Sequence, residues 1–331
     1  MTARRREPAP GVFRLVLPLP FPDLKAVNAY ALSDADGVTL VDCGIHNPSS
    51  EDGYGWYELV DALGACDIEP ASIVRLVITH PHPDHYGMAA RVVAESGCDL
   101  WMHRRAAGAL EVYRDPGPAI ARLRARLQAE GLEPAEVDEL ASFEDWRSYV
   151  PEVVDAAVWL DGGESFECGS RTWEIIHTPG HSPAHIGLWS SPEGALVSGD
   201  HLLGTITPHI DVGEGAEDPL DDFLSSLRRL EELDPMLVLP GHGRPFDDGA
   251  ERARTVARHH DRRLGSILQV IRRRPRSASS IANEIFGDAL LHFHRRLALG
   301  ETLAHLIYLL NRGEVERIGG PRGYLYVKAS R

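Results

Sequence analysis

The sequence predicts an α/β fold in which short buried strands alternate with helices. Residues 73–78 and 237–239 are apolar and rich in β-branched or aliphatic side chains, as expected for buried strands. Residues 88–95 and 219–233 have the pattern of helices. Polar side chains that can carry chemistry follow several of the strands directly, and open α/β sheets place their ligands at such strand ends. These observations together predict an α/β catalytic domain.

The length of 331 residues predicts a large domain followed by a smaller one. We place the catalytic domain at residues 1–248, with a helical insertion at about 104–150, and the C-terminal domain at 249–331. No apolar run approaches the roughly 20 residues of a membrane helix, and the first eight residues lack an apolar signal core. A cytoplasmic protein without a membrane partner is therefore expected. Four cysteines show no paired motif, which predicts free thiols at Cys43, Cys66, Cys98 and Cys168.

The charge of the chain is unevenly distributed. The net charge of −15 argues against a general nucleic-acid binder. Residues 250–331 carry a net +9, which leaves −24 for residues 1–249. A nucleic-acid partner for the basic tail therefore stays open as an alternative.

The stretch 79–87, Thr-His-Pro-His-Pro-Asp-His-Tyr-Gly, carries three imidazoles and a carboxylate within six residues. Its two prolines favour extended geometry, so that His80 and His82 should project to one side. Asp84 and His85 come at the turn and can face a second point. Imidazole suits zinc and iron, and carboxylate oxygens suit harder cations. The stretch lies between a buried strand and a helix, which favours a metal site over a histidine-rich surface loop.

The pattern His-x-His-x-Asp-His resembles the metallo-β-lactamase superfamily, and three further motifs follow in the family's order. They are Thr-Pro-Gly-His-Ser at 178–182, Gly-Asp at 199–200 and Gly-His-Gly at 241–243, each after a strand-like run. The resemblance covers about residues 10–248. It implies an αββα four-layer sandwich, which specifies the α/β class predicted above.

The resemblance also implies a dinuclear metal site. One ion would be held by His80, His82 and His181, and the other by Asp84, His85 and His242, with Asp200 between the two. Zinc is the first expectation, with iron or manganese as alternatives. No cysteine occupies a ligand position, which argues against antibiotic hydrolysis. Asp42, in an Asp-x-Gly at 42–44, would support the ligands or simply cap a turn.

The function expected from this site is hydrolysis by a hydroxide that bridges the two metals. Asp84 would orient that nucleophile and Asp200 would fix the metal spacing, so both are candidate catalytic residues. A thiolate leaves without a general acid, which favours a small-molecule thioester of the acyl-CoA or acyl-glutathione type, as in the glyoxalase II-like part of the superfamily. The alternatives are a metal-dependent endoribonuclease, a hydrolase of lactones or other esters, and a non-catalytic metal-binding or redox-sensing protein.

The substrate pocket is expected to involve two segments. Helices are predicted at 104–113, 119–130 and 134–149, and this insertion would either form a lid or only pack together. Its candidate wall residues are Tyr113, Phe143, Trp146 and Tyr149. Residues 202–210 should line the pocket floor, where His209 is a candidate substrate contact. His185 lies four residues after His181, but we expect a hydrogen-bonding role for it.

The tail is predicted to form helices at 251–274, 277–287 and 300–312, followed by a hairpin of strands 314–318 and 324–327. This order resembles a winged helix, which one branch of the superfamily carries. Such a tail could bind nucleic acid, or it could pack against the acidic domain or a second copy of the chain. Its aromatic residues are not interleaved with basic ones as in single-strand binders, and the packing or homodimer role is favoured.

Overall fold

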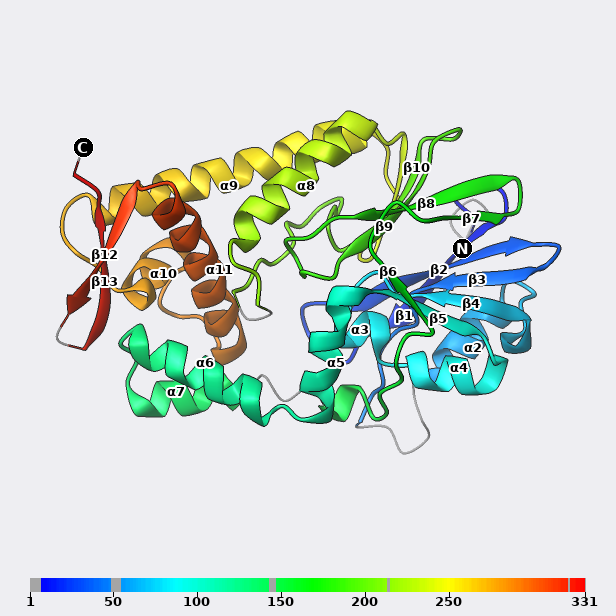
Figure 1. Ribbon diagram of the computed structural model, residues 1–331, viewed down its shortest axis with the longest axis horizontal. Coiled ribbons are helices and arrows are strands. Elements are labelled where there is room, and N and C mark those ends of the chain that lie inside the picture. Colours follow the sequence, from blue (N-terminus) through cyan, green and yellow to red (C-terminus); the bar gives the residue numbers. More distant parts are fainter. Residues whose placement is uncertain (1–6, 49–54, 143–146, 213–214, 321, 331) are drawn as a thin grey trace.

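The computed structural model describes the chain except for residues 1–6, 49–54, 143–146, 213–214, 321 and 331, and two sheets form its centre (Figure 1). The first sheet has the order β1-β2-β3-β4-β5-β6 and the second the order β11-β10-β9-β8-β7. The strands of the first sheet are β1 (Val12–Pro18), β2 (Ala26–Asp34), β3 (Gly37–Val41), β4 (Ile73–Val77), β5 (Asp99–His103) and β6 (Val158–Leu160). Those of the second are β7 (Ser165–Cys168), β8 (Arg171–His177), β9 (Ile186–Ser190), β10 (Ala195–Gly199) and β11 (Leu237–Pro240).

Helices cover the outer face of each sheet, which gives the four-layer αββα sandwich that the sequence predicted. Helices α2 (Trp56–Gly64), α3 (Pro83–Tyr86) and α4 (Ala89–Ser96) lie on the side of the first sheet, and α8 (Pro219–Leu233) and α9 (Gly249–Ile271) on the side of the second (Figure 1). Between the sheets lies an apolar layer to which Tyr30 and Val77 contribute from the first sheet and Trp173 and Leu188 from the second. Because both faces of each sheet are covered, a central strand such as β10 is buried at every residue.

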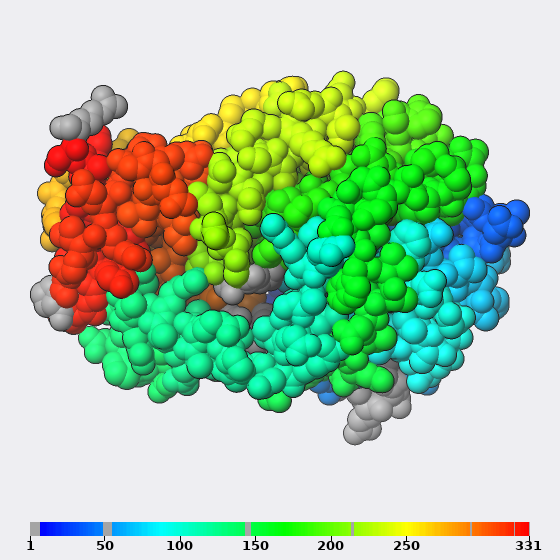
Figure 2. Space-filling view, viewed as in Figure 1, coloured from blue at the N-terminus to red at the C-terminus, as the bar shows by residue number. Residues whose placement is uncertain are grey.

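The insertion connects the neighbouring parallel strands β5 and β6. It contains α5 (Ala107–Arg114), α6 (Gly117–Ala129) and α7 (Pro134–Ala141). The predicted helix at 134–149 is shorter than expected, since α7 ends at Ala141 and residues 147–149 form a separate 3-10 turn. Figure 2 shows the surface hollowed between α5 and α6 of the insertion and the segment at the start of α8.

The tail continues from α9 into α10 (Ala278–Phe286), α11 (His292–Asn311) and the hairpin of β12 (Val315–Gly320) and β13 (Gly323–Lys328). Helices and a two-stranded sheet were predicted here, and the winged-helix type itself stays a prediction. Helix α11 begins eight residues before the predicted start at Gly300. A side chain would not fit at Gly300 inside the helix, because a Cβ there would lie 2.6 Å from Oδ1 of Asp211. The close approach of the segment that carries Asp211 therefore explains the glycine, which does not mark the start of the helix.

The tail shares one hydrophobic core with the second sheet and the insertion. This cluster joins Leu127 of α6, Phe223 of α8, Ile267 of α9 and Leu306 of α11. Residues 302–306 of α11 are all buried, so neighbours surround the helix on every side at this point. The tail, predicted as a separate unit, is therefore joined to the rest of the chain by continuous packing.

Arginines of the tail pair with carboxylates of the first 248 residues, as expected for a packing module. Arg296 of α11 lies 2.8 Å from Asp211, and Arg312 lies 2.7 Å from Asp221. Arg295 also pairs with Glu136 of α7.

Within the described ranges, none of the helices is both long and apolar enough to span a bilayer.

Candidate metal centre

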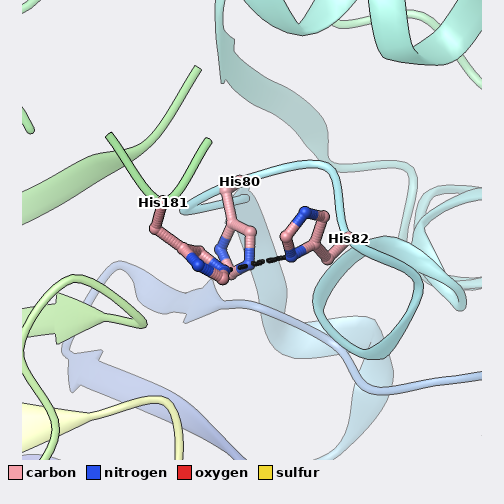
Figure 3. A group of neighbouring side chains, drawn as sticks. All are labelled: His80, His82 and His181. Atoms are coloured by element: carbon pink, nitrogen blue, oxygen red, sulfur yellow. Dashed lines mark hydrogen bonds between the residues drawn. The ribbon is translucent and has the colours of Figure 1, made fainter. Parts of the chain in front are cut away.

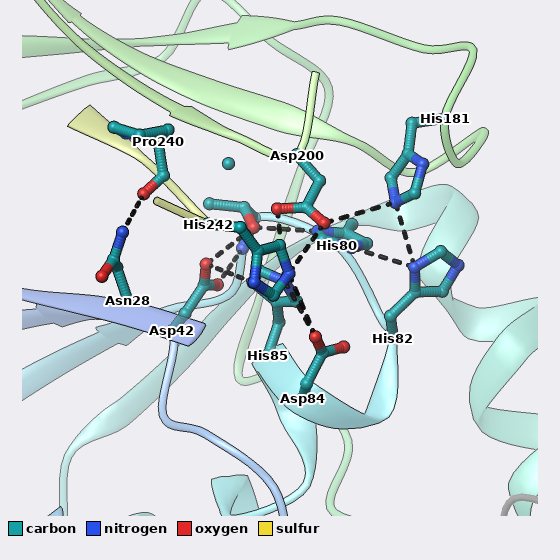
Figure 4. A network of polar contacts seen from close by, with 12 residues as sticks. Asn28, Asp42, His80, His82, Asp84, His85, His181, Asp200, Pro240 and His242 are labelled. Atoms are coloured by element: carbon teal, nitrogen blue, oxygen red, sulfur yellow. Dashed lines mark hydrogen bonds and ion pairs between the residues drawn. The ribbon is translucent and has the colours of Figure 1, made fainter. Parts of the chain in front are cut away.

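Four loops bring the predicted ligands together, each after a strand. The loop after β4 carries His80 and His82 and leads into α3, which contains Asp84 and His85. His181 follows β8, Asp200 follows β10 and His242 follows β11. Both sheets therefore contribute to one point between them, and all seven predicted ligands lie there (Figure 4).

The first group consists of His80, His82 and His181 (Figure 3). Nδ1 of His82 lies 3.1 Å from Nε2 of His80 and 3.1 Å from Nε2 of His181. Two imidazole nitrogens bound to one zinc ion at about 2.0–2.1 Å would lie about 3.3 Å apart. The three nitrogens are thus spaced as ligands of a single ion.

The remaining ring nitrogens of two of these histidines are held by the protein. Nδ1 of His181 donates to the carbonyl oxygen of His209 at 2.7 Å. Nδ1 of His80 lies 3.0 Å from Oγ1 of Thr79. Such contacts fix the ring orientation and leave Nε2 directed at the centre, as is usual for metal-ligating histidines.

The second group consists of Asp84, His85 and His242. Nε2 of His242 lies 3.2 Å from Oδ2 of Asp84, and Nε2 of His85 lies 3.7 Å from the same oxygen. Helix α3 starts at Pro83, directly after His82, so one turn of helix directs Asp84 and His85 to this second point.

Asp200 lies between the two groups. Its Oδ2 is 3.2 Å from Nε2 of His242 and 3.9 Å from Nε2 of His181, and its Oδ1 is 3.5 Å from Nε2 of His85. Oδ1 of Asp200 and Nε2 of His85 are buried and make no hydrogen bond. Buried polar atoms are rarely left this way, so this donor set fits divalent cations that would bind them.

Asp42 supports the second group directly. Its Oδ2 lies 2.8 Å from Nδ1 of His85 and accepts a hydrogen bond from the hydroxyl of Thr79 at 2.9 Å. Its Oδ1 accepts from the Thr79 amide at 2.7 Å. Of the two roles considered for Asp42, the structure supports that of holding the ligands.

The structure also shows supporting residues that the sequence reasoning missed. Nδ2 of Asn28 donates to the carbonyl oxygens of Pro240 and Gly243, and the Tyr30 hydroxyl donates to that of Pro240. These bonds hold the Gly-His-Gly loop around His242. The available signal was an asparagine in the middle of an apolar strand, where a buried amide needs partners.

The electrostatics of the second group balance carboxylates against imidazoles. Burial opposes the charged forms, but His85 and His242 outweigh it and hold the pKa of Asp84 at about 2. Burial likewise opposes the charge on His242, but Asp200 and Asp84 raise its pKa to about 10. The same carboxylates and Asp42 raise the pKa of His85 well above its usual value. Without a metal, protons on these two rings therefore neutralise the carboxylates.

Metal binding is expected to release protons for this reason. His85 and His242 must be neutral to act as ligands, so loading the metal-free chain with Zn²⁺ near pH 7 should displace about two protons. The apparent affinity should fall as the pH is lowered. Calorimetric titrations in buffers of different ionisation enthalpy measure the number released, and a heat that does not depend on the buffer would contradict the expectation.

Gly241 is the position where a small change should disturb the centre most. A Cβ there would lie 2.1 Å from Oδ1 of Asp200 and 2.8 Å from Cε1 of His85. Gly241→Ala should therefore lower metal affinity about 100-fold, which is the upper end for changes beside a ligand. The control is Gly265→Ala in α9, where a Cβ meets no atom within 4 Å. Equal metal content in both variants would contradict this prediction.

The candidate substrate contacts of the insertion lie in different surroundings. The Tyr113 hydroxyl donates to the carbonyl oxygen of Pro81 at 2.6 Å, and its ring, 8% exposed, stacks with Tyr86. The Tyr113 hydroxyl therefore supports the metal loop, and a substrate contact by Tyr113 stays a prediction. Trp146 and Phe143 lie outside the described residues. Tyr149 packs against Phe21.

His209 is held by charged neighbours. Nδ1 of its ring lies 3.9 Å from Glu301 and Nε2 lies 3.9 Å from Asp211. Burial opposes its charge, but these carboxylates raise the pKa of His209 to about 9. Its carbonyl oxygen accepts from His181, so His209 lies behind a ligand, and a substrate contact by its ring stays a prediction. His185 is buried, contacts Thr178 and accepts from the Asp200 amide, as expected of a hydrogen-bonding residue.

The comparisons with known proteins agree with this geometry. The family model described as "Metallo-beta-lactamase superfamily" matches residues 22–242, and the model "Metallo-beta-lactamase-like, C-terminal domain" matches residues 264–329. The chain belongs to the metallo-β-lactamase superfamily. It is 24% identical to the probable metallo-hydrolase YqjP of Bacillus subtilis, over 83% of this chain and 85% of that protein.

Two solved structures share the fold over nearly the whole chain. A beta-lactamase domain protein from Burkholderia ambifaria is 34% identical with a TM-score of 0.82, covering 97% of this chain and 93% of that one. A metallo-beta-lactamase family protein from Thermus thermophilus is 29% identical, also with a TM-score of 0.82, covering 97% and 99%. Both alignments include the tail, so the shared fold extends beyond the catalytic sandwich.

Proposed function

We propose that this chain is a hydrolase that uses two divalent cations, zinc in the first place, to cleave small-molecule thioesters of the acyl-CoA or acyl-glutathione type. The observation that carries the proposal is the position of Asp200 between two separate groups of ligands. When bound, divalent cations would supply an activated water and polarise a carbonyl oxygen. His80, His82 and His181 would hold one cation, and Asp84, His85 and His242 the other.

The residues of the chain have defined tasks in this scheme. Asp200 would fix the spacing of the two cations, and Asp84, ionised at neutral pH, would accept a hydrogen bond and orient the attacking water. Cys43 is unsuited as a nucleophile, because it is buried behind His85 and burial raises its pKa well above the usual value. Attack by water therefore fits the centre better than a covalent route through this thiol.

The thioester class is supported by the leaving group. A thiolate has a pKa near 8.5 and departs without a proton donor, whereas an amine needs one. His85 and His242 would be metal ligands and unable to donate. Among the relatives, the atrochrysone carboxyl ACP thioesterase of Pseudocercospora fijiensis is 29% identical over 147 residues, covering 42% of each chain.

The test is a panel of acyl-CoA and acyl-glutathione thioesters assayed with the zinc-loaded chain. Matched oxygen esters, a lactone and short RNAs serve as competing substrates. We expect release of free thiol, which a thiol reagent detects, and its loss on chelation. Cleavage of RNA with no turnover of any thioester would replace the proposal with the ribonuclease alternative.

A further inference from the structure

A second group of metal-type donors lies in the C-terminal part of the chain, and it contains none of the seven ligands. It consists of His260 of α9 and Glu301 and His305 of α11, whose donor atoms lie within 4.8 Å of one another. Glu301 and His305 are four residues apart and hence on the same face of α11. Both imidazoles are fully buried, and the Glu301 side chain is 15% exposed.

We infer that His260, Glu301 and His305 form a third divalent-cation site, of the zinc type, that is separate from the catalytic pair. Nδ1 of His260 lies 3.1 Å from Nε2 of His305, the same separation as between the ring nitrogens of His80 and His82. Two neutral imidazoles and a carboxylate are a usual donor set for zinc, with water as a fourth ligand.

The hydrogen bonds around His305 direct a lone pair at the site. Nδ1 of His305 lies 2.7 Å from the carbonyl oxygen of Glu301, one turn earlier in α11. This contact requires the proton on Nδ1, so Nε2 carries the lone pair and faces His260. Burial lowers the pKa of His260 to about 3 and that of His305 to about 4, which keeps both rings neutral, as ligands must be.

A hydrogen bond between His260 and His305 without a cation explains this arrangement less well. If His260 donated its Nδ1 proton to His305, its Nε2 would carry a lone pair, and this buried atom has no hydrogen-bond partner. A cation bound through Nδ1 instead would leave the proton on Nε2 and no lone pair there to satisfy. Burying two imidazoles side by side in this core also needs a compensating interaction.

Charged neighbours set the expected strength of the site. Nη1 of Arg263 lies 3.0 Å from Oε1 of Glu301, and Nδ1 of His209 lies 3.9 Å from Oε2. Arg263 can remain on one oxygen while the other binds a cation, as carboxylate ligands are commonly hydrogen-bonded. Both neighbours still compete for the carboxylate, as positive charges. We therefore expect weaker binding than at the catalytic centre, and release of this ion first during stepwise chelation.

The experiment counts metals on the full-length chain. The metal-free wild type is titrated with Co²⁺, followed by visible absorption, and zinc-loaded samples are measured by elemental analysis. We expect three ions per wild-type chain, and one fewer in both His305→Gln and Glu301→Gln. His259→Gln is the matched control, because His259 is adjacent to His260 but outside the donor set, and it should retain three ions.

The experiment can distinguish failure of the third-site proposal from failure of the proposed function. Asp200→Asn should lose ions from the catalytic pair and retain the ion at His305, so the two losses should be independent. A wild-type titration that ends at two equivalents, both sensitive to Asp200→Asn, would overturn the third site and leave the proposed function intact. The wild-type titration decides the matter even if His305→Gln does not fold. Three ions with no dependence on His305 or Glu301 in folded variants would also overturn it.

Discussion

Asp200→Asn should abolish hydrolysis and remove at least one metal ion. Asp200 is the carboxylate that lies beside members of both groups, with Oδ2 near His242 and His181 and Oδ1 near His85. An amide of the same shape keeps the volume but loses the negative charge that the two proposed cations would require. The turnover number should fall at least about 1,000-fold, since both activation of water and charge stabilisation would depend on the pair of cations in the proposed mechanism.

The measurement combines elemental analysis with the thioester assay on the same sample. Asp161→Asn is the control, because Asp161 is an exposed carboxylate that pairs with Arg104 at the surface, where such pairs contribute little. A folded Asp200→Asn variant with two ions and near wild-type turnover would contradict the bridging role.

Truncation after residue 248 should prevent the remaining chain from folding stably. The removed segment includes Val256, Ile267, Leu303 and Leu306, all buried in the core that also contains Phe223 and Leu196 of the sandwich. A fully buried side chain of this size contributes about 1.5–3 kcal/mol. Four or five such losses equal the roughly 5–15 kcal/mol by which a domain is stable.

Circular dichroism melting of the truncated chain tests this, and a cooperative transition with the metals retained would contradict it. A milder variant gives a magnitude: Leu303→Ala should lower the free energy of unfolding by about 2–5 kcal/mol. Leu291→Ala, at a side chain that is 70% exposed, should change it by less than about 0.5 kcal/mol.

Any RNA affinity of the full chain should be weak and salt-sensitive, because several tail arginines are already paired with carboxylates.

The strands and their ends were predictable because apolar runs and the residues after them are local in sequence. His80 to His85 follow β4, and Asp200 and His242 follow β10 and β11, as predicted. The start of α11 was missed because Gly300 reads locally as a breaker, whereas its reason is the distant Asp211. The support from Asn28 and the joining of His260 to α11 were likewise not predictable from spacing. Both depend on which elements pack together, and local pattern carries no information on that.

The seven ligands link both halves of the chain across the gap between the sheets. In polymer terms, an ion held by both His85 and His242 would close a loop of about 160 residues, a role that disulfides have in small secreted domains. Ions that bind only the folded chain add stability that grows with the logarithm of their free concentration. With its ions bound, the proposed metal centre would therefore also act as a reversible cross-link. A chelator should then make the two sheets easier to separate and the connecting loops easier to digest.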